Sequence, residues 1–336
     1  MTLVEPYRAP RWLRLGFAAG HMQTILPALI SRRPFVRYRR ERWDTPPSEL
    51  GDDFIDVDFV DATDEHTPLV VMFHGLEGSS HSHYACALMH AVQTRGWAGA
   101  VPHFRGCSGE PNRTARAYHS GDTQEIDWII DRFARRYPQR PIYACGISLG
   151  GNALAKWLGE YLDAARRVRR AAIVSAPLDL RAGGRALSSG FNMVYTRMFL
   201  RTLKEKAIAK AQRHAELAHL SARAHEIIAA RDLYAYDNLY TAPVHGFRDT
   251  DDYWTRASAK PWLAHIQVPT LVLNARNDPF MPADALPRAF EVSPSVVLEQ
   301  PEEGGHVGFA TGGFPGRLDW LPTRLLQFFA DDARDG

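Results

Sequence analysis

The chain has 336 residues, which is enough for one large α/β domain or for such a domain with an inserted subdomain. Hydrophobic residues make up 45% and charged residues 23%, as in ordinary globular proteins, and the net charge of +2 argues neither for nor against a polyanionic partner. Because the Lys and Arg residues are dispersed, with no basic patch interleaved with aromatics, we do not expect nucleic-acid binding.

Cysteine usage and the first residues indicate the compartment. Cys86, Cys107 and Cys145 form no CxxC pair and leave one thiol unpaired under any disulfide scheme, so reduced thiols in the cytoplasm fit best. The N-terminus lacks a charged segment followed by an apolar run and a small-residue cleavage site. No window approaches the roughly 20 apolar residues that a membrane-spanning helix needs. We expect a soluble cytoplasmic protein without stable membrane insertion.

In chain order, the pattern begins with an arm and continues as alternating strands and helices. Residues 1–50 contain several prolines and the Arg-rich segment 31–42, which predicts an N-terminal arm packed on the core. From residue 54 onward we predict strands at 54–60, 69–73, 98–102, 141–145, 171–175, 270–274 and 295–299, and helices at 84–95, 122–137 and 149–161. This alternation is typical of an α/β protein whose mostly parallel sheet carries helices on both faces. The core is then formed by residues 51–177 and 266–336.

The long stretch between the two parts of the core, residues 178–265, contains no strand-like run. Its Ala, Lys, Arg and Leu content predicts a helical insertion, placed where a lid over an active site is common. The alternatives are a plain surface hairpin and a basic amphipathic helix on a membrane, although the charges are too evenly mixed to favour the latter. Its apolar residues either line an acyl pocket or pack the insertion onto the sheet, in particular Phe191, Met193, Tyr195 and Phe199.

The pentapeptide Gly146-Ile147-Ser148-Leu149-Gly150 stands between a predicted strand and a predicted helix. G-x-S-x-G in this setting is typical of the nucleophile elbow of serine hydrolases. The flanking glycines let strand and helix approach closely, and the sharp turn forces the serine into a strained conformation. Its hydroxyl then projects above the sheet with a helix N-terminus beneath it, where developing negative charge is favoured.

A serine becomes a good nucleophile only when an imidazole accepts its proton and an acid orients that imidazole. In proteins with this elbow the chain order is serine, acid, histidine. Asp278 follows the strand 270–274 closely and is the predicted acid, with Asp284 as an alternative further from the strand end. Since His306 is the only histidine after both, it is the predicted base.

Backbone N–H groups should stabilise the oxyanion that forms during acyl transfer. The N–H of Leu149, directly after the serine, is one predicted donor. The N–H of Leu76, in the loop after the strand 69–73, is the other. His74 precedes the nucleophile in the chain, and we expect it to make structural hydrogen bonds.

With these residues placed, the chain resembles the YheT-type branch of the α/β-hydrolases, which is related to the mammalian abhydrolase-domain phospholipases and esterases. The matching segments run over nearly the whole chain and comprise residues 20–24, 73–79, 103–112, 118–122, 148–152, 174–177, 278–281 and 304–309. The resemblance implies the α/β-hydrolase fold, a charge-relay system of Ser148, Asp278 and His306, and esters or lipids as substrates. It also singles out Arg105, for which holding loops is the favoured role.

These observations predict a carboxylic ester hydrolase that acts through an acyl-enzyme on short- or medium-chain esters or on lipid esters. Thioester and amide hydrolysis are neighbouring chemistries for the same residues. The alternative from another class is a catalytically silent scaffold with a binding or regulatory role. Because no group of His, Cys and carboxylates has metal-ligand spacing and no strand-linked G-x-G-x-x-G occurs, we expect no metal and no cofactor. The sequence assigns no substrate-binding residue, and the expected partner is an ester substrate.

Overall fold

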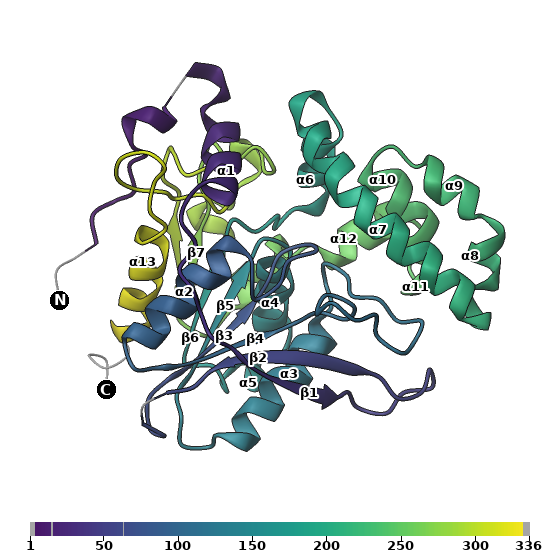
Figure 1. Cartoon of the computed structure of the whole chain (residues 1–336), viewed down its shortest axis with the longest axis horizontal. Helices are drawn as coiled ribbons and strands as arrows, with labels where there is room; N and C mark the ends of the chain where they lie inside the picture. Colours follow the sequence, from purple (N-terminus) through teal and green to yellow (C-terminus); the bar gives the residue numbers. More distant parts are fainter. Residues whose placement is uncertain (1–3, 15, 63, 332–336) are drawn as a thin grey trace.

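The structure is a computed structural model that describes residues 4–14, 16–62 and 64–331. These residues form one sheet of eight strands in the order β1-β2-β4-β3-β5-β6-β7-β8 (Figure 1). The strands from β4 across to β8 pair in parallel, whereas β2 is antiparallel to both of its neighbours. The predicted α/β fold with a mostly parallel sheet is confirmed. The strands are β1 (Arg39–Asp44), β2 (Phe54–Val60), β3 (Leu69–Phe73), β4 (Ala98–Pro102), β5 (Ile142–Ile147), β6 (Arg170–Val174), β7 (Thr270–Leu273) and β8 (Val296–Glu299).

Strand β1 lies within the segment for which the sequence predicted only an N-terminal arm. Its residues are Arg-Arg-Glu-Arg-Trp-Asp, and Trp43 is the one buried side chain among them. Because β1 is an edge strand, most of its side chains face solvent. It therefore lacks the alternation of apolar and polar residues that indicates a half-buried strand.

Helices cover both faces of the sheet and bury it from two sides. Along β3, Leu69, Val71 and Phe73 belong to one apolar core, while Val70 and Met72 belong to the other. A strand buried on both faces reads as a continuous apolar run, which is why β3 was recognisable. Helices α3 (Thr123–Arg136) and α4 (Leu149–Glu160) pack into the first core, and α2 (His83–Thr94) and α13 (Trp320–Ala330) into the second. The core region also contains α1 (Ala19–Leu29), α5 (Leu162–Ala165) and the 3-10 turns Arg11–Leu13, Gly16–Ala18, Lys260–His265, Ala283–Ala285 and Ala289–Glu291.

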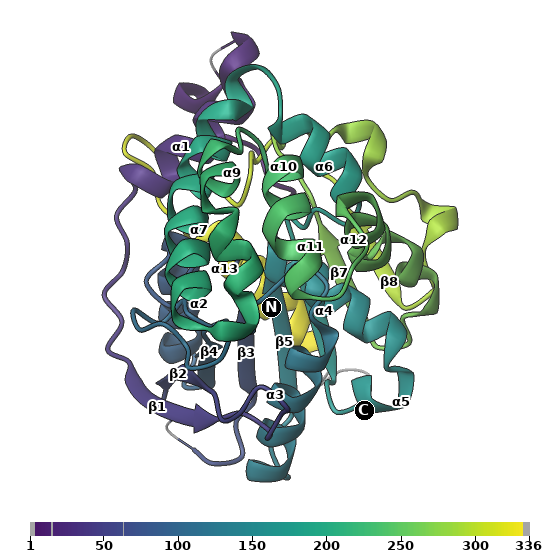
Figure 2. The ribbon, with the colours of Figure 1, turned by 90° about the vertical axis from the view of Figure 1, so that its right-hand side faces the viewer.

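The predicted insertion between β6 and β7 consists of helices joined by short loops, and its last predicted residues, Lys260–His265, pack into the first core of the sheet. Its helices gather on one side of the molecule in Figure 1 and stand in front of the sheet in Figure 2. One of its small apolar clusters joins Leu200, Tyr236 and Tyr240 to Ala115 of the loop between β4 and α3. Its elements are α6 (Leu180–Leu187), α7 (Met193–Arg213), α8 (Ala218–Ala222), α9 (Ala224–Ala229), α10 (Leu233–Tyr236), α11 (Ala242–Val244), α12 (Thr250–Ala257), a π-helical turn (Asp237–Thr241) and the 3-10 turns Gly190–Asn192 and Ala215–Leu217.

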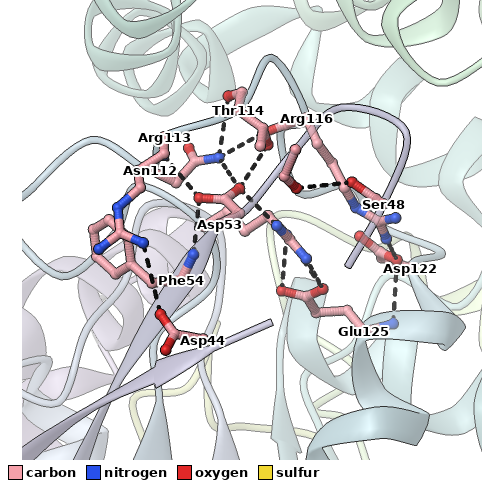
Figure 3. Close-up of polar contacts among 12 residues, drawn as sticks. Asp44, Ser48, Asp53, Phe54, Asn112, Arg113, Thr114, Arg116, Asp122 and Glu125 are labelled. Carbon is pink, nitrogen blue, oxygen red and sulfur yellow. Dashed lines mark hydrogen bonds and ion pairs between the residues drawn. The ribbon is translucent and has the colours of Figure 1, made fainter. Parts of the chain in front are cut away.

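A buried ionic cluster fastens the long loop between β4 and α3 to the sheet. Arg105 donates to Glu125 of α3 through Nε and Nη2 (3.1 and 2.9 Å to Oε1 and Oε2) and to Asp53 Oδ2 through Nη1 (2.6 Å). Asp53 also accepts from the side chains of Asn112 (2.7 Å) and Thr114 (2.6 Å). Figure 3 shows Asn112 and Thr114 reaching Asp53 from the loop above it. The structure therefore gives Arg105 the loop-holding role that the sequence favoured.

We predict that Arg105→Met destabilises the fold strongly. The side chains of Asp53 and Glu125 are each only 1% exposed, so losing the guanidinium leaves two buried carboxylates without their cation. Removing one partner from a buried ion pair costs about 3–5 kcal/mol of unfolding free energy. The matched control is Arg135→Met, because the Arg135 side chain is 80% exposed and pairs with Asp131 at the surface. Urea unfolding should show a change within about 0.5 kcal/mol for this control, and equal losses in the two variants would contradict the assignment.

His74, at the end of β3, uses both ring nitrogens within the fold. Nδ1 lies 2.8 Å from the carbonyl oxygen of Gly75, and Nε2 lies 3.0 Å from the backbone nitrogen of Phe104. Since the Phe104 N–H can only donate, Nε2 must be unprotonated and Nδ1 carries the hydrogen. Burial, followed by the nearby His103, lowers the pKa of His74 to about 3. The ring is therefore a neutral structural link, as the sequence indicated.

From this pKa we predict that His74 makes the fold sensitive to acid. Its folded-state pKa lies below the unfolded value of about 6.5, so the unfolded chain binds the proton preferentially between these values. The contribution of His74 is complete above about pH 6.5 and is lost as pH falls, by up to about 1.4 kcal/mol per pH unit. Urea unfolding between pH 7 and pH 4.5 should show a steeper loss for the natural chain than for His74→Gln. Parallel pH profiles would refute this role.

Candidate active site

Ser148 lies at a sharp turn between β5, which ends at Ile147, and α4, which begins at Leu149. Its backbone has φ +53° and ψ −120°, a conformation that a non-glycine residue adopts only under constraint. The Ser148 N–H donates to the carbonyl oxygen of Val174 (2.9 Å), which ties the turn to the end of β6. A Cβ at Gly150 would come within 2.5 Å of the carbonyl oxygen of Phe73, so only glycine fits there. The predicted elbow is present.

The structure brings Ser148, His306 and Asp278 together in one hydrogen-bonded series. His306 Nε2 lies 2.9 Å from Ser148 Oγ, and His306 Nδ1 lies 2.9 Å from Asp278 Oδ2. Asp278 stands in the loop after β7, and its side chain is 1% exposed, whereas the side chain of His306 is 11% exposed. The other oxygen of Asp278, Oδ1, accepts from the N–H of Phe280 (2.8 Å). An acid held in this way can orient the imidazole toward the serine.

Asp284, the alternative acid, lies apart from this series. It is exposed in the 3-10 turn Ala283–Ala285 and lines a separate surface hollow with Arg276 and Arg288. The geometry thus favours Asp278 over Asp284.

The loop that carries His306 is held by groups from distant parts of the chain. The N–H of His306 donates to Thr24 Oγ1 of α1 (2.8 Å), and the N–H of Val307 donates to Ser175 Oγ (3.1 Å). The ring of Phe280 stacks on the imidazole with centroids 4.0 Å apart. The sequence assigned no role to Thr24 or Ser175. The one available signal was that both lie in segments matching the YheT-type proteins.

Gln23 of α1 joins the loops of the acid and the histidine. Its Oε1 accepts from the N–H of Gly304 (2.7 Å) and from Asn277 Nδ2 (2.9 Å), and its Nε2 donates to the carbonyl oxygen of Leu13 (3.0 Å). Gln23 is fully buried. Because one amide contacts the neighbours of both Asp278 and His306, the two loops are held in register with each other.

The two predicted oxyanion donors lie on either side of the serine. Leu149 is the first residue of α4, where a backbone N–H has no acceptor within the helix. Leu76 lies in a tight turn that is closed by the N–H of Gly78 donating to the carbonyl oxygen of Gly75 (2.9 Å). A Cβ at Gly75 would lie 3.1 Å from Ser148 Cβ, so this turn runs directly against the elbow. Two backbone donors beside one serine can hold a developing negative charge.

A cavity of about 630 Å³ opens at Ser148 and His306 and extends beneath the insertion. Volumes of 300–1,000 Å³ are usual for small-molecule sites. The insertion contributes Phe199, Leu203 and Tyr240 to its lining, with Leu76 on the core side.

The structure gives different positions to the four apolar residues that the sequence predicted either to line an acyl pocket or to pack the insertion onto the sheet. Phe199 lines the cavity. Tyr195 is buried against Phe280, with ring centroids 4.8 Å apart. Phe191 is 54% exposed and contacts the ring of His21, and Met193 does not line the cavity. Only Phe199 therefore belongs to a cavity wall.

Within residues 4–14, 16–62 and 64–331, no group of three His, Cys, Asp or Glu side chains could hold a metal ion. None of the helices in the same ranges has the length and apolar character needed to cross a membrane.

Comparisons with known proteins bear on the family and the fold of this chain. An Escherichia coli protein named "Putative esterase YheT" is 39% identical over 312 residues, covering 92% of this chain and 90% of its own. Human phospholipase ABHD3 is 28% identical (92% and 76% covered), and the monoacylglycerol lipase of Saccharomyces cerevisiae is 26% identical (80% and 61%). A Pyrococcus furiosus esterase structure shares the fold, with a TM-score of 0.54 at 13% identity and coverage of 91% of this chain and 99% of that one.

The family model for the alpha/beta hydrolase fold matches residues 68–313. This range is most of the chain and includes all three residues of the hydrogen-bonded series. The resemblance predicted from the sequence motifs is confirmed, and the chain belongs to the α/β-hydrolase family.

Proposed function

We propose that this protein is a serine hydrolase that cleaves carboxylic esters. The observation that carries the proposal is the series Asp278–His306–Ser148, with two hydrogen bonds of 2.9 Å, at the mouth of a cavity. The names of the relatives support the same class, since an esterase, a phospholipase and a monoacylglycerol lipase all act on esters. The free thiols of Cys86, Cys107 and Cys145 support a reducing, cytoplasmic setting.

In the first half of the proposed reaction, Ser148 Oγ attacks the ester carbonyl carbon while His306 Nε2 takes the hydroxyl proton. Asp278 keeps the Nδ1–H of the imidazole directed at itself and stabilises the imidazolium that forms. The N–H groups of Leu76 and Leu149 donate to the oxyanion of the tetrahedral intermediate. His306 then returns the proton to the leaving alcohol, and the acyl group stays on Ser148.

In the second half, a water molecule takes the place of the alcohol. His306 removes a proton from this water as it attacks the acyl-enzyme, and the acid product leaves when Ser148 regains its proton. The same series would serve a thioester or an amide, but the relatives' names favour oxygen esters. We propose short- or medium-chain esters or lipid esters as substrates, with the acyl chain in the cavity beside Phe199 and Leu203.

We predict that Ser148→Ala abolishes most esterase activity toward p-nitrophenyl butyrate. The loss should reach several orders of magnitude, leaving only the rate supported by binding and the oxyanion donors. A fluorophosphonate probe should label the natural chain and fail to label the variant. Unchanged turnover in Ser148→Ala would contradict the proposal. Failure of the probe to label the natural chain would favour the alternative of a catalytically silent scaffold.

The two candidate acids supply the matched control for this prediction. Asp278→Asn should fold yet lose much of the rate, because an amide favours the wrong tautomer of His306. Asp284→Asn should behave like the natural chain, since Asp284 is exposed and lies outside the cavity. The reverse pattern would show that the acid has been assigned to the wrong residue.

The cavity also predicts a dependence on acyl-chain length. Each methylene that leaves water for an apolar wall gains about 0.8 kcal/mol, or roughly fourfold in kcat/KM, until the space is full. A series of p-nitrophenyl esters should therefore rise from acetate and fall before palmitate. Leu203→Trp should shift the maximum to a shorter chain by filling part of the cavity, while turnover of the acetate ester changes little. A flat profile from acetate to palmitate would contradict a shaped acyl pocket.

A further inference from the structure

The turn that carries Leu76 is held by side chains from several other elements. Tyr84 of α2 accepts from the N–H of Gly75 (3.0 Å) through its hydroxyl oxygen. The hydroxyl oxygen of Tyr118 accepts from the N–H of Glu77 (3.0 Å), and the same hydroxyl donates to Glu77 Oε1 (2.8 Å). Glu77 is therefore bound through both its backbone and its carboxylate. It is the residue directly after the proposed oxyanion donor.

Glu77 adopts a backbone conformation that does not suit its side chain. Its φ is +54°, in the left-handed region. It follows Leu76 as the second central residue of the turn from Gly75 to Gly78, a place where positive φ normally selects glycine or asparagine. A residue with a Cβ costs about 1–2 kcal/mol in that region. The hydrogen bonds of the turn's backbone and the contacts to the Glu77 carboxylate together offset this cost.

The strongest of these contacts comes from the insertion. Lys206, on the long helix α7, places Nζ 2.9 Å from Glu77 Oε1 and 2.8 Å from Oε2. Its other polar neighbour is the Cys107 sulfur (3.8 Å), and burial raises the pKa of that thiol to about 12. The thiol is thus neutral at neutral pH, and Glu77 is the anion that Lys206 pairs with. The Glu77 side chain is 11% exposed and the Lys206 side chain 41% exposed, so the carboxylate is the more shielded partner of the pair.

We propose that Lys206 is a positioning residue that fixes the Leu76 N–H toward the oxyanion by holding Glu77. The helical insertion then does more than cover the cavity, because its seating on the core completes the oxyanion site. If α7 moves away, Glu77 loses its cation and the strained turn can relax. This inference rests on the proposed function, since it requires Leu76 to be an oxyanion donor.

The chain offers two matched lysines on the same helix. Lys210, one turn further along α7, donates to the carbonyl oxygens of Thr114 (2.7 Å) and Arg116 (3.0 Å), so it ties the helix to a different core loop. Lys204 donates to the carbonyl oxygen of Ile228 (2.8 Å) and so acts only inside the insertion. Replacing each by Met separates three effects: loss of the Glu77 contact, general loosening of α7, and a change within the insertion.

The experiment measures kcat and KM for p-nitrophenyl butyrate after thermal unfolding has shown that each variant is folded. Lys206→Met should lower kcat by about 10- to 100-fold, less than the 10²–10³-fold loss of a whole oxyanion donor, with KM within about threefold. Lys206→Arg should restore most of kcat, because it keeps the charge next to Glu77. Lys210→Met should affect kcat less than Lys206→Met does, and Lys204→Met should leave kcat unchanged.

Glu77→Gln removes the carboxylate partner of the same contact. It replaces Lys206→Met as the test variant if Lys206→Met does not fold. The double variant Lys206→Met/Glu77→Gln should be no slower than the slower single variant, since both remove one interaction. A natural kcat in Lys206→Met, or equal losses in Lys206→Met and Lys210→Met, would overturn this inference while leaving the proposed function intact if Ser148→Ala is inactive. An active Ser148→Ala would overturn both.

Discussion

The strained backbone of Ser148 is the constraint on which the rest of the site depends. Such a conformation costs about 1–3 kcal/mol and persists only where its surroundings fix it. Here β5 lies between β3 and β6 at the centre of the sheet, and α4 packs into the core beneath it. The serine therefore cannot adjust to its partners. The histidine and the acid have to be brought to it on loops, and those loops need supports of their own.

The residues that hold these loops lie in segments outside the serine elbow and the loops of Asp278 and His306. Gln23 and Thr24 lie on α1, yet one joins the loops of Asp278 and His306 and the other accepts from the His306 N–H. On the opposite side, Lys206 of the insertion and Tyr118 of the loop before α3 hold the turn of Leu76. Both the N-terminal arm and the insertion thus contact the loops around the serine.

Features that depend on residues close together in the chain could be predicted from the sequence. The elbow is a local pattern of glycines around Ser148, and Asp278 and His306 stand in fixed chain order after buried strands. The motif, the chain order and the absence of another histidine downstream were therefore enough to nominate all three, and the sheet strands β3, β5 and β7 were recognisable as apolar runs. Their catalytic roles stay a prediction.

Long-range contacts and exposed edges left no such pattern. The pair of Lys206 and Glu77 is separated by 129 positions, and nothing in either neighbourhood indicates the other. Strand β1 carries mostly exposed charged side chains, and the local pattern does not show that Arg40 and Arg42 pair with Asp58 and Asp56 of β2. Which apolar residues of α7 line the cavity likewise depends on how the helix is rotated about its axis, which the sequence does not indicate.

The hydrogen bond from His306 to Thr24 joins residues 282 positions apart in the chain. During synthesis, Thr24 leaves the ribosome 282 residues before its partner His306. Domains fold as units while the N-terminal part emerges first. A nascent chain that has emerged through Ser148 but not through Asp278 therefore holds the serine of the hydrogen-bonded series without its acid and its histidine. On the proposed function, chains whose synthesis stops before His306 would lack hydrolytic activity.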